Sequence, residues 1–201
     1  MLVAVESKRR RVPALAPEER RAALIDATIP LLHEHGVDVS TKQIAAAAGV
    51  AEGTIFGVFE TKTSLVVCSV IKALDPQPTL DALAAIDLSR PLRERLSQAA
   101  ELIHARFAEN AQIMTAARKL ILSGDASHQA ISNRRALQDA LTAVLAPDAE
   151  RLRRSPADVA SLLLLFCGAN TYGPFGDPDN FSGEETASLL LDGLLHRRGN
   201  E

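Results

Sequence analysis

The stretch that decides the fold is residues 40–62, which read STKQIAAAAGVAEGTIFGVFETK. Ser40 and Gln43 stand at the spacing of a capping box, in which each side chain accepts a hydrogen bond from the backbone N–H of the other, so a helix is predicted to begin there. This helix runs through four alanines to Gly49, whose freedom at positive φ suits a tight turn. A second short amphipathic segment, residues 52–59, follows within a few residues. Two short helices joined this closely are typical of a helix-turn-helix.

Amphipathic helices are predicted on both sides of this pair. Residues 17–35 repeat apolar side chains at helical spacing and are followed by Gly36, a common helix terminator. Thr61 and Lys62 open another helix, which is expected to end before the proline-rich residues 75–78, the best internal boundary. Further helices are predicted over residues 79–87, 91–108, 110–123, 127–145, 156–171 and 183–197.

The composition favours an all-α protein. Ala and Leu together make up 61 of the 201 residues, whereas aromatic residues number seven. Ala and Leu are the strongest apolar helix formers, so helices are expected throughout. The two cysteines, Cys68 and Cys167, belong to no CxxC pair, which argues against a disulfide scaffold or a zinc site.

The charge balance and the apolar runs limit the partners of this chain. A formal net charge of −3 provides no global field toward nucleic acid or an anionic membrane, so any such contact must be local. The longest apolar runs, residues 44–51 and 162–169, are too short to span a bilayer. The N-terminus places its few apolar residues before its charges, the reverse of a secretory signal peptide, so a cytoplasmic location without membrane contact is expected.

The pattern from Arg21 to Leu65 extends across three helices and their turns, and it resembles the TetR family of bacterial transcriptional regulators. The matching positions are Leu24, Ile25, Ala27, Leu31, Gly36, Ile44, Ala45, Ala48, Gly49, Val50, Gly53, Thr54, Ile55, Phe56, Phe59 and Lys62. The resemblance implies an all-α fold of about nine helices. Its expected parts are a mobile basic arm (1–15), a three-helix helix-turn-helix DNA-binding domain (16–62) and a larger helical domain for effector binding and dimerisation (63–201).

The helix geometry and the resemblance together imply which residues meet double-stranded DNA. A short second helix that exposes its N-terminal residues can enter the major groove and present them to base edges. Glu52 can accept from cytosine N4, and Lys42 can reach guanine or a phosphate. Thr41, Thr54 and Lys62 fall where the family places phosphate contacts. The expected DNA-binding residues are Thr41, Lys42, Glu52, Gly53, Thr54, Phe56, Gly57 and Lys62.

This sequence departs from the family pattern at the second helix. Phe56 replaces the usual Tyr and so loses a hydroxyl that would contact phosphate, Val58 stands where His is common, and Ala51 removes the usual Ser cap, worth about 1 kcal/mol. Gly57 offers no side chain at a position often used for readout. Few direct base contacts are therefore expected, and specificity would depend partly on DNA shape.

The N-terminal arm carries four consecutive cations, from Lys8 to Arg11. Such a run can lie in the minor groove beside a docked helix-turn-helix and add affinity through counterion release. It is equally compatible with a solubilising disordered tail.

The rest of the chain is expected to serve as sensor and dimer interface. The resemblance implies a symmetric homodimer on a pseudo-palindromic operator, formed through helices at about 156–171 and 183–197. The interface residues expected there are Val159, Ala160, Leu163, Leu164, Cys167, Gly168, Ala187, Leu190, Leu191, Leu194 and Leu195. It also implies a pocket for a small-molecule effector, with the candidate lining Ile103, Phe107, Met114, Ala117, Phe166 and Asn170.

Nothing in the sequence indicates an enzyme or a cofactor. His33 and His35 are alternate residues of one helix and point apart, so they cannot share a metal ion. No nucleophile elbow, phosphate loop or GxGxxG motif is present. The function predicted is a DNA-binding regulator, most simply a repressor that an effector releases. The alternative is a helical ligand carrier or interaction protein with a vestigial helix-turn-helix.

Overall fold

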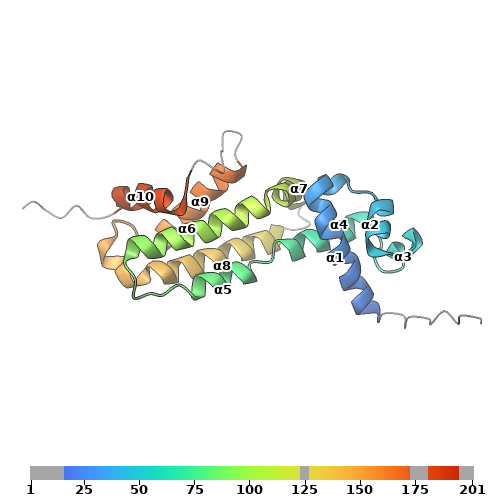
Figure 1. Ribbon diagram of the computed structural model, residues 1–201, viewed down its shortest axis with the longest axis horizontal. Coiled ribbons are helices and arrows are strands. Elements are labelled where there is room, and N and C mark those ends of the chain that lie inside the picture. The colour runs from blue at the N-terminus through green and yellow to red at the C-terminus, as the bar shows by residue number, and fades with distance from the viewer. Residues whose placement is uncertain (1–15, 123–126, 173–180, 195–201) are drawn as a thin grey trace, which may run out of the picture.

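The computed structural model describes residues 16–122, 127–172 and 181–194 (Figure 1). Helices account for the regular structure of these ranges, which contain no β-strand, so the predicted all-α fold is confirmed. The α-helices are α1 (Pro17–His35), α2 (Thr41–Ala48), α3 (Glu52–Phe56), α4 (Lys62–Ala73), α5 (Gln77–Ala84), α6 (Leu92–Glu109), α7 (Ala111–Leu122), α8 (Ser127–Leu145), α9 (Pro156–Tyr172) and α10 (Gly183–Leu194). Two 3-10 helices, η1 (Gly36–Asp38) and η2 (Ala146–Arg151), complete them.

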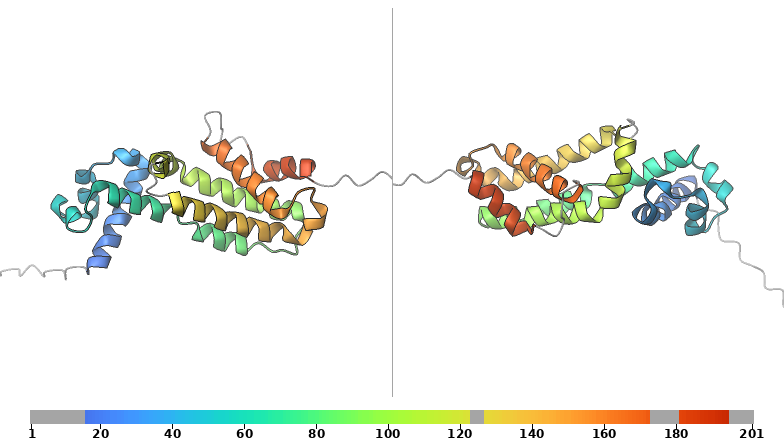
Figure 2. Two further views of the ribbon diagram at one scale, coloured as in Figure 1. Left: turned by 180° about the vertical axis from the view of Figure 1, so that it is seen from behind. Right: turned by 90° about the horizontal axis from the view of Figure 1, so that it is seen from above.

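The helices form a small head and an elongated bundle. Helices α1 to α4 make the head at one end, and the long helices α6 and α8 run along the bundle away from it (Figure 1). Within the bundle, α6 packs against α5, α8, α9 and α10. The views from behind and from above show the same two-part arrangement, with α7 lying at the junction (Figure 2). Helix α7 packs against α1 and α4 of the head as well as against α6, α8 and α9.

The predicted helix starts are confirmed where capping residues mark them. The Ser40 hydroxyl accepts from the Gln43 N–H over 3.2 Å, and the Gln43 side chain accepts from the Ser40 N–H over 2.8 Å. Ser182 and Glu185 form the same reciprocal pair at the start of α10. The end of α3 has no such capping signal, and there the structure differs from the prediction: α3 ends at Phe56 rather than at residue 59.

Two apolar cores stabilise the molecule. The larger lies inside the bundle and is built mainly from α6, α8, α9 and α10. The smaller lies in the head, where Leu24, Leu32, Ile44 and Leu65 are fully buried. Helix α7 contributes Ile113 and Ala117, both inaccessible to solvent, to this head core. The head core thus extends beyond residue 62 and includes a helix from the second half of the chain.

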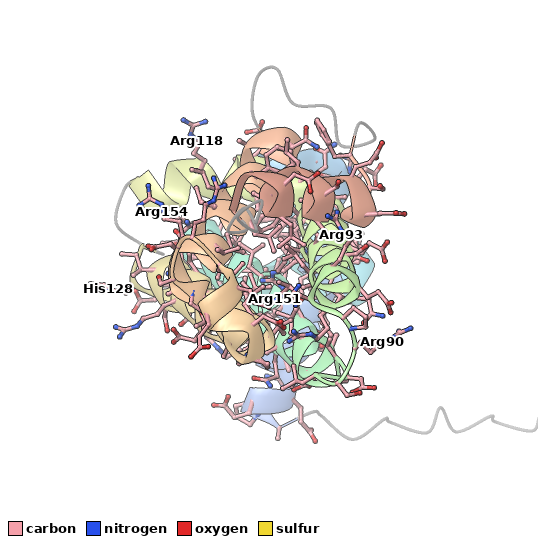
Figure 3. All side chains as sticks on the ribbon, turned by 90° about the vertical axis from the view of Figure 1, so that its left-hand side faces the viewer. Arg90, Arg93, Arg118, His128, Arg151 and Arg154 are labelled. Atoms are coloured by element: carbon pink, nitrogen blue, oxygen red, sulfur yellow. The ribbon has the colours of Figure 1, made fainter. Side chains whose placement is uncertain are left out.

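A buried ion pair stabilises the end of the bundle distant from the head, which faces the viewer in Figure 3. The Arg95 side chain is 1% exposed, and its guanidinium donates to the Asp148 carboxylate and to the backbone carbonyls of Arg90 and Val144. The exposed Arg151, labelled in Figure 3, pairs with the same carboxylate over 2.6 Å. These partners satisfy the buried Arg95 charge, which would otherwise be strongly destabilising.

None of the helices in the described ranges has the length and apolar character needed to cross a membrane.

Candidate nucleic-acid interface and ligand cavity

The two helices of the helix-turn-helix are fixed by buried side chains and one left-handed turn. Ile44 of α2 and Ile55 of α3 are fully buried in the head core. Phe59, just after α3, is buried in the same core. Gly49 ends α2 at φ 65° and ψ 31°, the left-handed conformation predicted for this position. The buried side of α3 therefore faces the core, and its other side faces solvent.

The residues predicted to read DNA share this solvent-facing surface. Glu52, Gly53, Phe56 and Gly57 are all exposed. Phe56 is 53% exposed, although the burial of a large aromatic ring is energetically favourable. Thr54 is half-buried in the same helix. A contiguous exposed surface on a short helix, with an aromatic ring on it, has the shape and chemistry to contact a groove edge.

One hydrogen bond links the two helices across this surface. The hydroxyl of Thr41, the first residue of α2, donates to the carboxylate of Glu52, the first residue of α3. Sequence reasoning assigned Thr41 to phosphate and Glu52 to a base, and it did not anticipate that the two side chains bind each other. In the DNA-free protein the negative charge of Glu52 is therefore held at the edge of the α3 surface.

Two lysines lie at the starts of the helices that precede and follow α3. Lys42 is exposed at the start of α2, and Lys62 is half-buried in the first turn of α4. Thr61 caps α4, since its hydroxyl accepts from the Ser64 N–H over 3.0 Å. Helix N-termini attract phosphate groups through their free N–H groups and their dipoles, so Lys62 adds a full charge to a favourable site. The arm residues Lys8 to Arg11 lie outside the described residues.

Arg21 braces the chain that follows α3, a contact that the sequence analysis missed. Its guanidinium lies 4.3 Å from the centre of the Phe59 ring, a cation–π distance, and it donates to the Cys68 sulfur over 3.1 Å. These contacts join α1, the segment after α3, and α4. The positive charge of Arg21 is therefore engaged within the head.

A cavity of about 300 Å³ lies in the bundle beside the head. Phe107 and Met114, two of the residues predicted to hold an effector, line it. Of the other predicted residues, Ile103 lies in the bundle core and Ala117 in the head core. The Phe166 ring packs edge-on against Phe181, with centroids 5.2 Å apart, and Asn170 is half-buried on α9. The remaining described lining residues are Leu74, Arg106, Asn110, Ala130, Asn133, Arg134, Leu137, Leu164 and Gly168.

A hydrogen-bonded network connects this cavity with the end of α4. The Arg106 guanidinium donates to the carbonyl oxygens of Leu74 over 2.7 Å and Asp75 over 2.9 Å. The Asn133 side chain also donates to Leu74, over 3.0 Å, and Asn110 donates to the Arg106 carbonyl over 2.8 Å. Leu74 is the C-cap of α4 and lines the cavity. One residue thus belongs to both the cavity wall and the helix that begins at Lys62.

The comparisons with known proteins agree with this geometry. Residues 24–67 match the model of bacterial regulatory proteins, tetR family. These residues are similar to the N-terminal domain of the tetR family. This family consists of DNA-binding regulators rather than enzymes, and the matched residues include α2, α3 and the start of α4.

Solved structures share the TetR-type fold over most of their length. A transcriptional regulator from Rhodococcus sp. RHA1 is 21% identical, with a TM-score of 0.64 over 90% of this chain and 98% of that one. A regulatory protein of the tetR family from Rhodococcus RHA1 is 19% identical, with a TM-score of 0.63 over 87% and 96%. SmeT, the repressor of the Stenotrophomonas maltophilia multidrug efflux pump SmeDEF, is 20% identical, with a TM-score of 0.55 over 89% and 91%. At these identities the likeness establishes the fold.

The apolar face that was assigned to a dimer interface on α9 and α10 is buried within the single chain. Val159, Ala160, Leu163, Leu164, Cys167, Ala187 and Leu191 all lie in the bundle core. Leu190 packs partly against that core, Gly168 lines the cavity, and the side chains of Leu194 and Leu195 lie outside the described part. Helical periodicity marks the apolar face of a helix, but it does not distinguish a neighbour in the same chain from one in another. Among the residues that the structure describes, the large apolar side chains that α9 and α10 expose are Leu162, Leu165 and Leu189, at 41%, 61% and 53%.

A part-buried polar cluster lies between α6, α9 and α10. His104 Nε2 lies 3.0 Å from the Thr186 hydroxyl and 3.5 Å from the Cys167 sulfur. Burial lowers the pKa of His104 and raises the pKa of the Cys167 thiol to about 12. The thiol therefore stays protonated at neutral pH and is a poor nucleophile. Within the described ranges no group of three His, Cys, Asp or Glu residues is placed to bind a metal ion.

Proposed function

We propose that this chain is a sequence-specific transcriptional repressor that binds a pseudo-palindromic operator as a cytoplasmic homodimer and is released by a small-molecule effector. The observation that carries the proposal is the exposed α3 surface of a TetR-family domain, held by a buried face and a left-handed glycine turn. A helix of this kind docks in the major groove, and the threonines and lysines around it position the phosphates. Repression is supported by the structural likeness to SmeT, itself a repressor.

The proposed readout combines a few direct contacts with phosphate positioning. Lys42 in the first turn of α2 and Glu52 at the start of α3 are exposed and are proposed to reach bases. Thr41, Thr54 and Lys62 are proposed to bind phosphates. Phe56 is proposed to pack on a sugar edge or a thymine methyl group, which would bury a ring that is now exposed.

The proposed dimer forms through α9 and α10, using the apolar side chains that these helices expose rather than those in the core. Leu162 and Leu165 lie on α9 and Leu189 on α10. Two heads at a fixed separation are needed to match two half-sites, so dimerisation would set the operator spacing. Burial of these leucines would supply the apolar free energy for association.

The proposed release depends on the position of the cavity. An effector in it would touch Leu74, the C-cap of α4, and Met114 of α7, the helix that packs on α1 and α4. A ligand that favours one arrangement of these helices shifts the separation of the two heads. Such coupling is commonly worth about 1–3 kcal/mol in affinity.

The test is a fluorescence-anisotropy titration of the full chain against the DNA flanking its own gene and against scrambled DNA, at several salt concentrations. Tight, salt-dependent binding with a preference for the flanking DNA is expected. Thr54→Ala combined with Lys62→Ala should weaken binding to every sequence and lower the salt slope by about one or more. Lys72→Ala is the control, because it removes a similar charge from the opposite end of α4. Unchanged affinity in the double variant would exclude this surface as the docking element.

A second candidate function is a helical ligand carrier with a vestigial helix-turn-helix. It is favoured by the charge of the head, since residues 16–62 hold four basic and seven acidic side chains. A net negative surface opposes approach to DNA. This candidate requires that no salt-dependent affinity appears for flanking, scrambled or genome-selected DNA, whereas the cavity still binds its ligand.

A further inference from the structure

We infer that the cavity beside α4 binds an amphipathic molecule with a single carboxylate, and that Arg134 holds this carboxylate at the rim. The inference rests on the proposed function, whose effector it assigns to a chemical class. It is carried by the lining of the cavity, which combines an apolar interior with two guanidinium groups.

The inner wall of the cavity is apolar. Phe107, Met114, Leu137 and Leu164 line it from four different helices, and the last two are 4% and 2% exposed. A wall of this kind stabilises an apolar body by removing it from water. Gly168 leaves room beside the Phe107 ring, since a methyl group there would lie 3.6 Å from Phe107 Cε2. The occupant therefore has an apolar part that reaches this wall.

The charged residues in the described part of the cavity lining have one sign. Arg106 and Arg134 are its charged residues among the described lining, and no Asp or Glu occurs in that part of the lining. A cationic ligand would be repelled by both guanidinium groups, which is unfavourable in a partly desolvated site. An anionic group is attracted by both. The lining thus selects for negative charge at one end of the ligand.

The polar side chains of the cavity lining differ in the hydrogen bonds that they already make. Arg106 donates to the Leu74 and Asp75 carbonyls, and the amides of Asn110 and Asn133 donate to backbone carbonyls. Arg134 makes no hydrogen bond or ion pair within the described part of the chain, and it is the exposed member of the described lining. One guanidinium fork binds one carboxylate through two parallel hydrogen bonds. A single carboxylate near the surface, with its apolar body inside, fits this arrangement.

Isothermal titration calorimetry of the full chain with octanoate tests the inference, with octan-1-ol and octylammonium as probes of the same chain length. Octanoate is expected to bind at least about tenfold more tightly than either analogue, because it alone forms the charged pair. Arg134→Ala is expected to weaken octanoate binding about tenfold or more and to leave octan-1-ol binding unchanged. Arg135→Ala is the matched control, since it removes a neighbouring exposed arginine that does not line the cavity.

Three outcomes would overturn the inference. Equal octanoate affinity in the parent, Arg134→Ala and Arg135→Ala would show that Arg134 does not hold the carboxylate. Preference for the alcohol or the amine would assign another ligand class, and no binding of any probe would exclude the apolar interior as an alkyl site. Because no DNA is present, these results are independent of the repressor proposal. The repressor proposal fails separately if the protein has no affinity for DNA, or if octanoate binds the cavity and leaves the affinity for DNA unchanged.

Discussion

The guanidinium of Arg106, in the last turn of α6, donates to the carbonyl oxygen of Leu74 at the end of α4 over 2.7 Å. The last carbonyls of a helix have no partner within the helix, and here a charged side chain from α6 satisfies them. The contact is part-buried and links residues 32 positions apart in the chain. It therefore ties α4 of the head to the wall of the cavity.

Replacing Arg106 with Met should destabilise the protein. The change keeps the apolar part of the side chain but removes two charge-assisted hydrogen bonds to the carbonyls of Leu74 and Asp75. A decrease of about 1–3 kcal/mol in the free energy of unfolding is expected from urea denaturation. Arg135→Met, on an exposed position of α8, should change it by less than about 0.5 kcal/mol. Equal stability of the two variants would show that the link to α4 is dispensable.

Glu52→Gln should strengthen non-specific DNA binding and reduce discrimination. The carboxylate accepts from Thr41 on the surface that would face DNA, so it places a negative charge close to phosphates. The amide keeps an acceptor for Thr41 but removes the charge. Affinity for scrambled DNA should rise several-fold in an anisotropy titration, while the ratio between operator and scrambled DNA should fall. An unchanged affinity for both would mean that Glu52 stays away from the duplex.

The basic arm should supply much of the affinity for DNA. Residues 16–62 carry more acidic than basic side chains, whereas residues 8–11 are four consecutive cations. Replacing these four residues with Gln should weaken binding to all DNA sequences. It should also reduce the slope of log affinity against log salt concentration by the amount expected for the loss of several phosphate contacts. The same titration with Lys72→Ala serves as the comparison. Retained affinity and slope would identify the arm as a solubilising tail.

Two glycines of the bundle, Gly168 and Gly183, should respond in opposite ways to replacement by alanine. At Gly183 an added methyl group would overlap the Ser97 carbonyl oxygen and Cγ of Glu101, because α10 begins directly against α6. Gly183→Ala should therefore lower the free energy of unfolding by about 1–3 kcal/mol. Gly168→Ala meets Phe107 at an ordinary contact distance of 3.6 Å, and the helix gain should stabilise the protein by up to about 1 kcal/mol. Thermal unfolding of the two variants measures both effects. A Gly183→Ala variant more stable than Gly168→Ala would contradict the packing of α10 against α6.

Acid should destabilise the contact between α6 and α10 through His104. Burial lowers its pKa below the ordinary value of 6.5, so the unfolded chain binds a proton that the folded chain resists. The stability associated with neutral His104 is thus complete above pH 6.5 and is lost as the pH falls below it. Replacing His104 with Gln should reduce the rise in the free energy of unfolding between about pH 5.5 and 7.5. His33→Gln, at an exposed position of α1, is the control, and equal slopes in both variants would refute the assignment.

The helix-turn-helix could be predicted because its determinants are local. Ser40, Gln43 and Gly49 act on their own helix ends, and the periodicity of α2 and α3 distinguishes their buried from their exposed sides. Helix α3 ends earlier than predicted because its last residues turn at Gly57, with the N–H groups of Val58 and Phe59 both donating to the Ile55 carbonyl.

The cavity and the interface could be predicted only in part, because they depend on which helices meet. Of the residues predicted to bind an effector, Phe107 and Met114 line the cavity, whereas Ile103 and Ala117 belong to two different cores. Arg134 looks in the sequence like any solvent-facing arginine, and nothing local shows that it stands at a cavity rim. The contribution of each of these residues to DNA or ligand binding stays a prediction.

The position of α7 limits how the molecule can be divided. Since Ile113 and Ala117 close the head core, a fragment cut after α4 would present an apolar face to water. The head therefore cannot be exchanged between proteins as a separate unit. A chimaera that joins it to the bundle of another regulator would need a matching α7. Natural recombination at the junction would meet the same obstacle. New ligand specificities would therefore be reached more readily by substitution around the cavity than by exchange of whole bundles.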